Sequence, residues 1–126
     1  MATILIIDDD EDFRRTLAAI LTAAGHAVAA AADGLEGANL FRAAPCDLVL
    51  TDMVMPHAGL MAIRVLREQY PGVRVIAMTG AGAHRLDYAR SLGAGATLAK
   101  PFTPEQLAAA VATALAVRHP LPASPT

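Results

Sequence analysis

The chain of 126 residues contains only one cysteine, Cys46, and no tryptophan. A single cysteine cannot form a disulfide within the chain, and no cluster of cysteines and histidines offers a zinc site. No apolar run approaches the ~18 residues that a membrane-spanning helix needs. The sequence turns acidic at Asp8, where a signal peptide would continue its apolar region. These absences predict a cytoplasmic protein that does not engage a membrane.

Positive charge is also scarce in this chain. Ten lysines and arginines face twelve acidic residues, the formal net charge is -2, and no run of basic residues occurs. Binding to nucleic acid requires a concentration of positive charge that neutralises phosphates. We therefore predict no direct contact with nucleic acid. The only lysine among the ten basic residues is Lys100, whose compact ammonium differs from the planar fork of an arginine.

Strands and helices are predicted to alternate along the chain. Short apolar runs predict strands at residues 3–7, 27–31, 47–51, 73–78 and 96–99. Helical spacing and helix punctuation predict helices at 11–24, 60–69 and 85–92, and two more that begin after Asp33 and Thr103. This order favours an α/β fold: a doubly wound, five-stranded parallel sheet with helices on both faces, flavodoxin-like in its (βα)5 order. We expect one domain at residues 1–118 and a proline-rich tail or linker stub at 119–126.

Charged and hydroxyl side chains stand where the predicted strands end, which is the edge at which such sheets bind ligands. These residues are Asp8 and Asp9, Asp52, Thr79 and Lys100. Carboxylates that meet at one edge repel each other unless a cation lies between them, and oxygen-only ligands suit Mg²⁺. Mg²⁺ usually pairs one or two carboxylates with a phosphate, and an aspartate can itself accept a phosphoryl group. The pattern thus indicates a magnesium-dependent phosphoryl site.

Four separated motifs carry a family resemblance. ILIIDDDEDFRR, DLVLTDMVMP, IAMTG and LAKPF follow one another in this order between residues 3 and 118. Together they resemble the receiver domain of two-component response regulators, most of all the stand-alone, chemotaxis-type receivers. The resemblance implies a protein that takes a phosphoryl group from a sensor histidine kinase or a histidine phosphotransfer protein and then changes its affinity for an output protein, whose identity is unknown. It implies no enzymatic activity beyond self-phosphorylation and self-dephosphorylation.

The same resemblance implies a role for each residue at the strand ends. Asp52 would be the phosphoacceptor, Thr79 the switch hydroxyl, and Lys100 the partner of the phosphoryl group. The Mg²⁺ ligands would be Asp9, Asp52 and the backbone carbonyl of Val54, with Asp8 contributing through a water molecule. The Lys100–Pro101 peptide bond is expected to be cis. Phe13, in the first helix, is either an exposed anchor for kinase docking or a core residue.

Three features depart from the family pattern. Thr97 stands where an aromatic residue usually relays the switch, and the loops that follow Asp52 and Thr79 are each one residue short. Only a short proline-rich stretch follows residue 118 in this sequence, and we expect no effector domain. We therefore expect a stand-alone receiver, rather than an excised fragment, that stays monomeric when phosphorylated.

Other protein classes share parts of this pattern. Asp8, Asp10 and Asp12 form the start of a calcium loop, but Phe13 and Ala19 replace the glycine and glutamate that such a loop needs. A phosphohydrolase of the haloacid dehalogenase type would use an aspartate of the first strand as its nucleophile. A receiver-like binding module that never takes phosphate is a further alternative.

Overall fold

The computed structural model describes residues 2–52, 64–65, 67–79 and 96–116. Its elements, in chain order, are β1 (Thr3–Ile7), α1 (Glu11–Ala23), β2 (Ala27–Ala31), α2 (Gly34–Ala43), β3 (Leu48–Asp52), β4 (Arg74–Thr79), β5 (Ala96–Ala99) and α5 (Pro104–Ala116). None of the helices in these ranges is long and apolar enough to cross a membrane.

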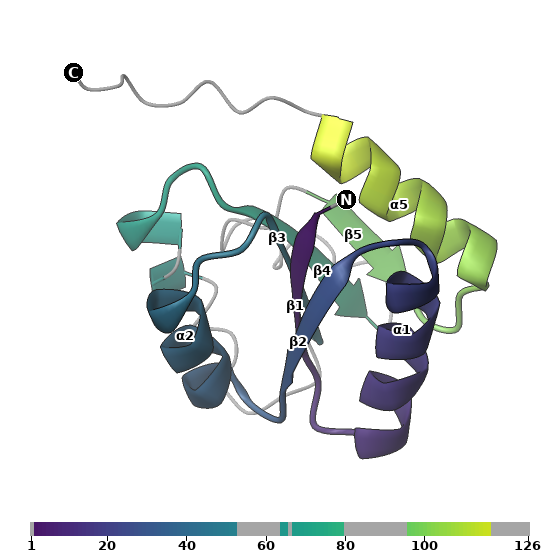
Figure 1. Cartoon of the computed structure of the whole chain (residues 1–126), viewed down its shortest axis with the longest axis horizontal. Helices are drawn as coiled ribbons and strands as arrows, with labels where there is room; N and C mark the ends of the chain where they lie inside the picture. The colour runs from purple at the N-terminus through teal and green to yellow at the C-terminus, as the bar shows by residue number, and fades with distance from the viewer. Residues whose placement is uncertain (1, 53–63, 66, 80–95, 117–126) are drawn as a thin grey trace.

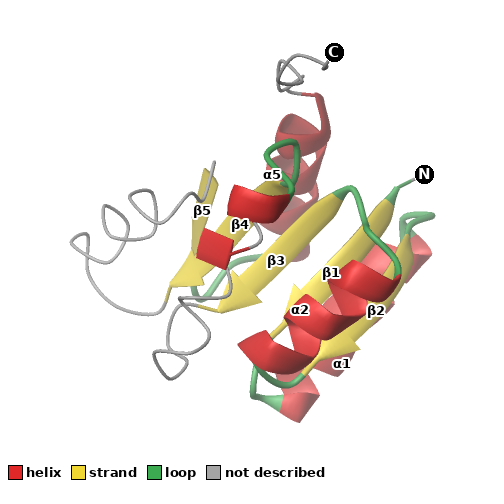
Figure 2. Ribbon diagram, turned by 90° about the vertical axis from the view of Figure 1, so that its left-hand side faces the viewer, coloured by secondary structure: helices red, strands yellow, loops and turns green. Residues whose placement is uncertain are grey.

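The strands form one five-stranded sheet in the order β2-β1-β3-β4-β5, and all neighbouring strands are parallel. Figure 1 shows α1 and α5 on one face of the sheet and α2 on the other, and in Figure 2 all the strand arrows point the same way. This architecture confirms the predicted doubly wound α/β fold. Successive strands are added on opposite sides of β1, so the strand order reverses between β1 and β3, where such folds bind their ligands.

The predicted element bounds hold closely. β1, β2 and β5 match their predicted ranges, whereas β3 and β4 each begin and end one residue later than predicted. The shift matters for β3, because it makes Asp52 the last residue of the strand instead of the first residue after it. Residues 64, 65 and 67–69 are helical, as predicted for the end of the 60–69 helix. The rest of that helix, the 85–92 helix and the tail at 119–126 lie outside the described residues.

Capping residues explain where α2 and α5 begin and where α1 ends. The Asp33 carboxylate accepts a hydrogen bond from the Glu36 amide at 2.8 Å at the start of α2. At the start of α5, the Thr103 hydroxyl accepts from the Gln106 amide at 3.0 Å, and the Gln106 side chain accepts from the Thr103 amide at 2.9 Å. Gly25 ends α1 with φ of +96°, a conformation that favours glycine.

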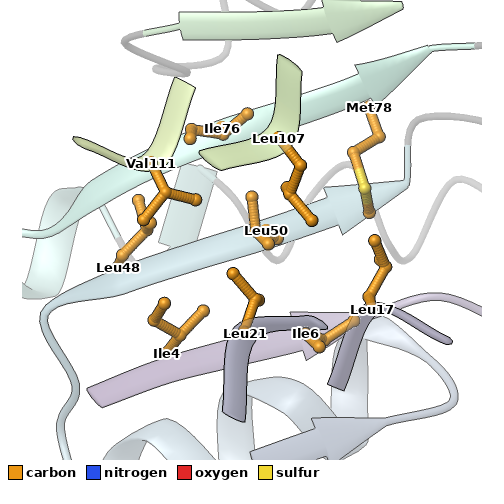
Figure 3. Close-up of a cluster of buried hydrophobic side chains, with 10 residues drawn as sticks. All are labelled: Ile4, Ile6, Leu17, Leu21, Leu48, Leu50, Ile76, Met78, Leu107 and Val111. Atoms are coloured by element: carbon orange, nitrogen blue, oxygen red, sulfur yellow. The ribbon is translucent and has the colours of Figure 1, made fainter. Parts of the chain in front are cut away.

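The core between the sheet and the α1/α5 pair is built from large aliphatic side chains (Figure 3). Its members are Ile4, Ile6, Leu17, Leu21, Leu48, Leu50, Ile76, Met78, Leu107 and Val111. A second core lies against the opposite face of the sheet and consists of Leu5, Ile7, Ala31, Ala38, Phe41, Val49, Val73, Val75 and Ala77. Alternate residues of β1, β3 and β4 enter the two cores, as the pleat of a strand buried on both faces requires.

Candidate functional site

The pleat of the sheet directs three charged side chains toward one face at its carboxyl edge. Alternate residues of β1, β3 and β5 pack in or against the α1/α5 core: Ile4 and Ile6, Leu48 and Leu50, Ala96 and Leu98. Asp8, Asp52 and Lys100 are each the next residue in these alternating series. Because side chains two residues apart lie on the same face of a strand, the three charges converge above the α1/α5 core.

Asp8 is completely buried and is held at both of its carboxylate oxygens. Its Oδ1 accepts a hydrogen bond from the Asp10 amide at 2.9 Å, and its Oδ2 lies 3.0 Å from the Lys100 ammonium. The backbone of Asp8 is also fixed, because its amide donates to the Ala31 carbonyl and its carbonyl accepts from Arg14 Nη1 at 2.8 Å. Burial of this carboxylate is tolerable because these donors replace the water that it loses.

Lys100 stands between two buried carboxylates. Its Nζ lies 3.0 Å from Asp8 Oδ2 and 3.5 Å from Asp52 Oδ2, and a quarter of the Lys100 side chain remains exposed. Asp52 itself is only 3% exposed. Three carboxylates, those of Asp8, Asp9 and Asp52, outnumber the Lys100 ammonium and the Arg14 guanidinium beside Asp8, so negative charge is in excess at this edge. A further cation would be stabilised here.

Asp8, Asp9 and Asp52 together could hold that cation. One carboxylate oxygen from each lies within 4.8 Å of the others. All the donors are oxygens, two come from buried residues, and Asp9 opens the set to solvent. This donor chemistry fits a hard cation such as Mg²⁺, which prefers carboxylates and retains several water ligands.

The start of α1 lies directly against the site. Asp10 is the N-cap residue, and its Oδ1 accepts from the Phe13 amide at 3.1 Å. The Phe13 ring packs edge-to-face on Phe102, with ring centroids 5.7 Å apart, and lies 4.2 Å from Lys100 Nζ. Phe13 is half-buried. Its exposure is thus intermediate between that of a core residue and that of an exposed docking anchor, the two roles predicted for it.

The structure brings together four of the predicted site residues: Asp8, Asp9, Asp52 and Lys100. Thr79 ends β4, the neighbour of β3, but the position of its side chain is not described, and Val54 lies outside the described residues. The predicted cis bond between Lys100 and Pro101 is confirmed. Thr97 is a half-buried residue of β5 whose Cα pairs with that of Ala77.

Two contacts of the site were not anticipated from the sequence: the short pairing of Lys100 with Asp8, and the Phe13 ring beneath the ammonium. Strand parity was the available signal for the first contact, because Asp8 and Lys100 both continue an inward-facing series. No comparable signal exists for the second contact, because helical spacing alone does not say which side chain of another element a residue touches.

A parallel α/β sheet with an acidic cluster and a lysine at its strand ends is typical of phosphoryl-accepting signalling domains. Comparison with known proteins identifies the family. Residues 4–112 match the model of the response regulator receiver domain family. The chain belongs to this family, whose members act in two-component systems and interact with sensor kinases. The match favours neither the phosphohydrolase nor the unphosphorylated module.

Individual relatives agree with this assignment. The chain is 39% identical over 115 residues to the probable transcriptional regulatory protein SilR of Salmonella typhimurium; the alignment covers 89% of the chain and 50% of SilR. It is 33% identical to a solved receiver domain protein of Clostridium thermocellum, with a TM-score of 0.81 and coverage of 91% and 94%. For the Vibrio cholerae chemotaxis protein CheY4 the identity is 29%, the TM-score 0.85 and the coverage 91% and 99%. The chain thus spans about half the length of the curated relative.

Proposed function

We propose that the chain is a phospho-accepting receiver in which Asp52 takes a phosphoryl group from a histidine of a sensor kinase or phosphotransfer protein. The observation that carries the proposal is the position of the Asp52 carboxylate. It is almost fully buried at the end of a central strand, 3.5 Å from Lys100 Nζ, with oxygens of two more aspartates within 4.8 Å. A purely structural aspartate needs no such surroundings.

The transfer step uses groups that are already in place. A carboxylate oxygen of Asp52 attacks the phosphorus of a phosphohistidine, and the P–N bond breaks as the P–O bond forms. The electron pair of the broken bond returns to the imidazole nitrogen, which takes up a proton from solvent. Lys100 lies close enough to Asp52 to move onto a phosphoryl oxygen without a large rearrangement, and its charge opposes that of the transferred group.

Asp8, Asp9 and Asp52 would hold the metal, together with the Val54 carbonyl that the resemblance implies. A bound Mg²⁺ supplies positive charge that offsets the phosphoryl oxygens as they approach the carboxylates. Of the three carboxylates, we assign Asp8 an indirect role, because its two oxygens are engaged by the Asp10 amide and Lys100. Asp9, which is exposed, would be the direct ligand together with Asp52.

Phosphorylation then acts as a switch. It replaces the single negative charge of the Asp52 carboxylate with the roughly -1.5 to -2 charges of a phosphoryl group, and the Thr79 hydroxyl is the group we expect to move onto the phosphoryl oxygens. The altered surface changes affinity for an output protein. We propose that the protein catalyses no reaction beyond the gain and loss of this phosphoryl group. We also propose that it acts in the cytoplasm.

The test is labelling of the purified protein with a small acyl phosphate in the presence of Mg²⁺, followed by intact-mass and peptide analysis. We expect one phosphoryl group on the parent protein and none on Asp52→Asn. Asp33→Asn, which removes the exposed aspartate that caps α2, is the control and should label like the parent. A parent protein that takes no label, or an Asp52→Asn variant labelled to full stoichiometry, would overturn the proposal.

The oligomeric state is a separate part of the proposal. Thr97 replaces the aromatic side chain that relays the switch in the family, and a threonine repacks less surface than a ring when the two states exchange. We expect the protein to sediment as a monomer at micromolar concentration both with and without beryllofluoride, a phosphoryl mimic. A dimer that appears only with beryllofluoride contradicts this expectation.

A further inference from the structure

The ring of Phe13 lies beneath the only lysine of the chain. Lys100 Nζ is 4.2 Å from the ring centroid, well inside the range at which an ammonium is attracted by the face of an aromatic ring. The same ammonium pairs with Asp8 and Asp52. Lys100 is thus contacted by carboxylates on one side and by an aromatic face on another.

These contacts close into a cycle. The two oxygens of Asp8 hold the Lys100 ammonium and the Asp10 amide, and Asp10 in turn caps α1 through the Phe13 amide at 3.1 Å. The Phe13 ring then returns to Lys100. Phe102 supports the ring edge-to-face from the opposite end of the chain. The start of α1 therefore fixes the position of the Phe13 ring. Because Asp8 bonds both to this helix start and to Lys100, it fixes the ring and the ammonium relative to each other.

We propose that Phe13 is a positioning residue for Lys100, which holds the ammonium between Asp8 and Asp52 so that it meets the incoming phosphoryl group. The inference rests on the proposed function of Asp52. A lysine side chain has four rotatable bonds and a strongly hydrated head, so an unsupported ammonium would sample many positions. An aromatic face attracts the cation but accepts no strong hydrogen bond, so it leaves the N–H donors for the carboxylates and the phosphoryl oxygens.

This role differs from a docking role for the same residue. A docking anchor affects transfer from a partner protein only, whereas a positioning residue also affects transfer from a small phosphodonor that has no surface to dock. A leucine at position 13 would fill most of the space of the phenyl ring without its electrostatic attraction for the ammonium. Tyrosine and tryptophan would retain that attraction.

The experiment compares Phe13→Leu, Phe13→Tyr and Phe13→Trp with the parent in two measurements. The first is the rate of Asp52 labelling by a small acyl phosphate with Mg²⁺. We expect Phe13→Leu to be slower by about two- to fivefold, the factor that a partly exposed cation–π contact is worth, and Tyr or Trp to restore the rate. The second is the proton NMR shift of the Lys100 side chain, which the ring should move upfield in the parent and in the aromatic variants but not in Phe13→Leu.

Phe41→Leu is the matched control, because it also replaces a phenyl ring by leucine, but in the core on the opposite face of the sheet, where the ring packs on Tyr70. It should label within twofold of the parent. Equal rates for Phe13→Leu and the parent would overturn the inference, as would a loss in Phe13→Leu that Tyr and Trp fail to restore or that Phe41→Leu reproduces. A parent protein that takes no label refutes the proposed function instead, and the NMR shift then still reports whether the ring holds the lysine.

Discussion

The two faces of the sheet are packed in different ways. Of the largest fully buried side chains in the described part of the chain, all but Ile7 lie on the α1/α5 face, where branched and long aliphatic residues interlock (Figure 3). Among the described residues of the α2 face, smaller side chains such as Ala31, Ala38 and Ala77 stand beside larger ones such as Phe41. A cavity of about 290 Å³ with an almost wholly apolar lining, partly open to solvent, lies between α2, β1 and β2.

The difference in packing between the two faces coincides with the position of the charged site. Asp8, Asp52 and Lys100 all project toward the densely packed face, where neighbouring side chains restrict their movement. Close-packed interiors transmit small displacements and hold side chains in single rotamers. Dense packing therefore occurs on the face where the geometry of charged groups matters, and the molecule tolerates a cavity on the other.

The strongest test of this difference removes the same side chain from each face. Leu50 and Leu5 are both almost fully buried, but Leu50 lies in the α1/α5 core and Leu5 lines the cavity. Leucine-to-alanine changes cost about 2–5 kcal/mol, and the cost is smaller where the side chain, because it faces a cavity, has fewer contacts to lose. We expect Leu50→Ala to fall near the upper end and Leu5→Ala near the lower end in urea unfolding. Equal losses would mean that the two faces are packed alike.

A smaller effect is expected where α2 approaches the sheet most closely. A Cβ added at Gly37 would lie 2.7 Å from Ile7 Cγ1, and closer still to Ile7 Cδ1, so the helix or the isoleucine must shift. Overpacking costs about 1–3 kcal/mol, and alanine regains up to about 1 kcal/mol of helix propensity. We expect Gly37→Ala to lose about 1 kcal/mol in the free energy of unfolding.

Ile7→Val provides the control for that prediction, because it removes the Cδ1 atom nearest to the added methyl group. In a double-mutant cycle the two changes should couple favourably, by about 0.5 kcal/mol or more. Additive losses would show that α2 does not approach the sheet at Gly37 as the structure indicates.

Cys46 lies in the lining of the cavity and is partly buried. Burial raises the pKa of the Cys46 thiol to about 11, because the thiolate loses solvation there. The thiol is protonated in both states at pH 7, but as the pH rises toward 11 the unfolded chain ionises first. Folding stability should therefore fall over this range, and Cys46→Ala should lack that part of the fall. Identical pH profiles for parent and variant in urea unfolding would refute the raised pKa.

The smallest effect is expected from partly filling the cavity. Ala29 of β2 lines it, whereas the adjacent Ala30, which points to the other face, does not. Both substitutions to valine gain the same β-strand propensity. The difference in stability between the two variants therefore reports the effect of filling the cavity. We expect Ala29→Val to be more stable than Ala30→Val by about 0.5–1 kcal/mol in thermal or urea unfolding. If Ala30→Val is the more stable variant, the cavity does not accept the added methyl groups.

Much of the fold was predictable because its signals are local. Capping residues such as Asp33 and Thr103 marked helix starts, since their side chains bond to amides only three residues away. The strand at 27–31, almost all alanine, was identified correctly although alanine favours helix. Pairing with β1 along its whole length holds it in place, and that pairing is a tertiary contact.

The site divides in the same way. The sequence alone determined which residue types end each strand, and a parallel sheet necessarily brings those ends to one edge; this is why Asp8, Asp9, Asp52 and Lys100 could be named together. Only the tertiary structure decided that Lys100 pairs more closely with Asp8 than with Asp52 and that its ammonium lies on the Phe13 ring. The physical reason is that both contacts join β5 to residues at the end of β1 and the start of α1. Their distances depend on how far α1 and β5 lie from each other, which no local pattern specifies.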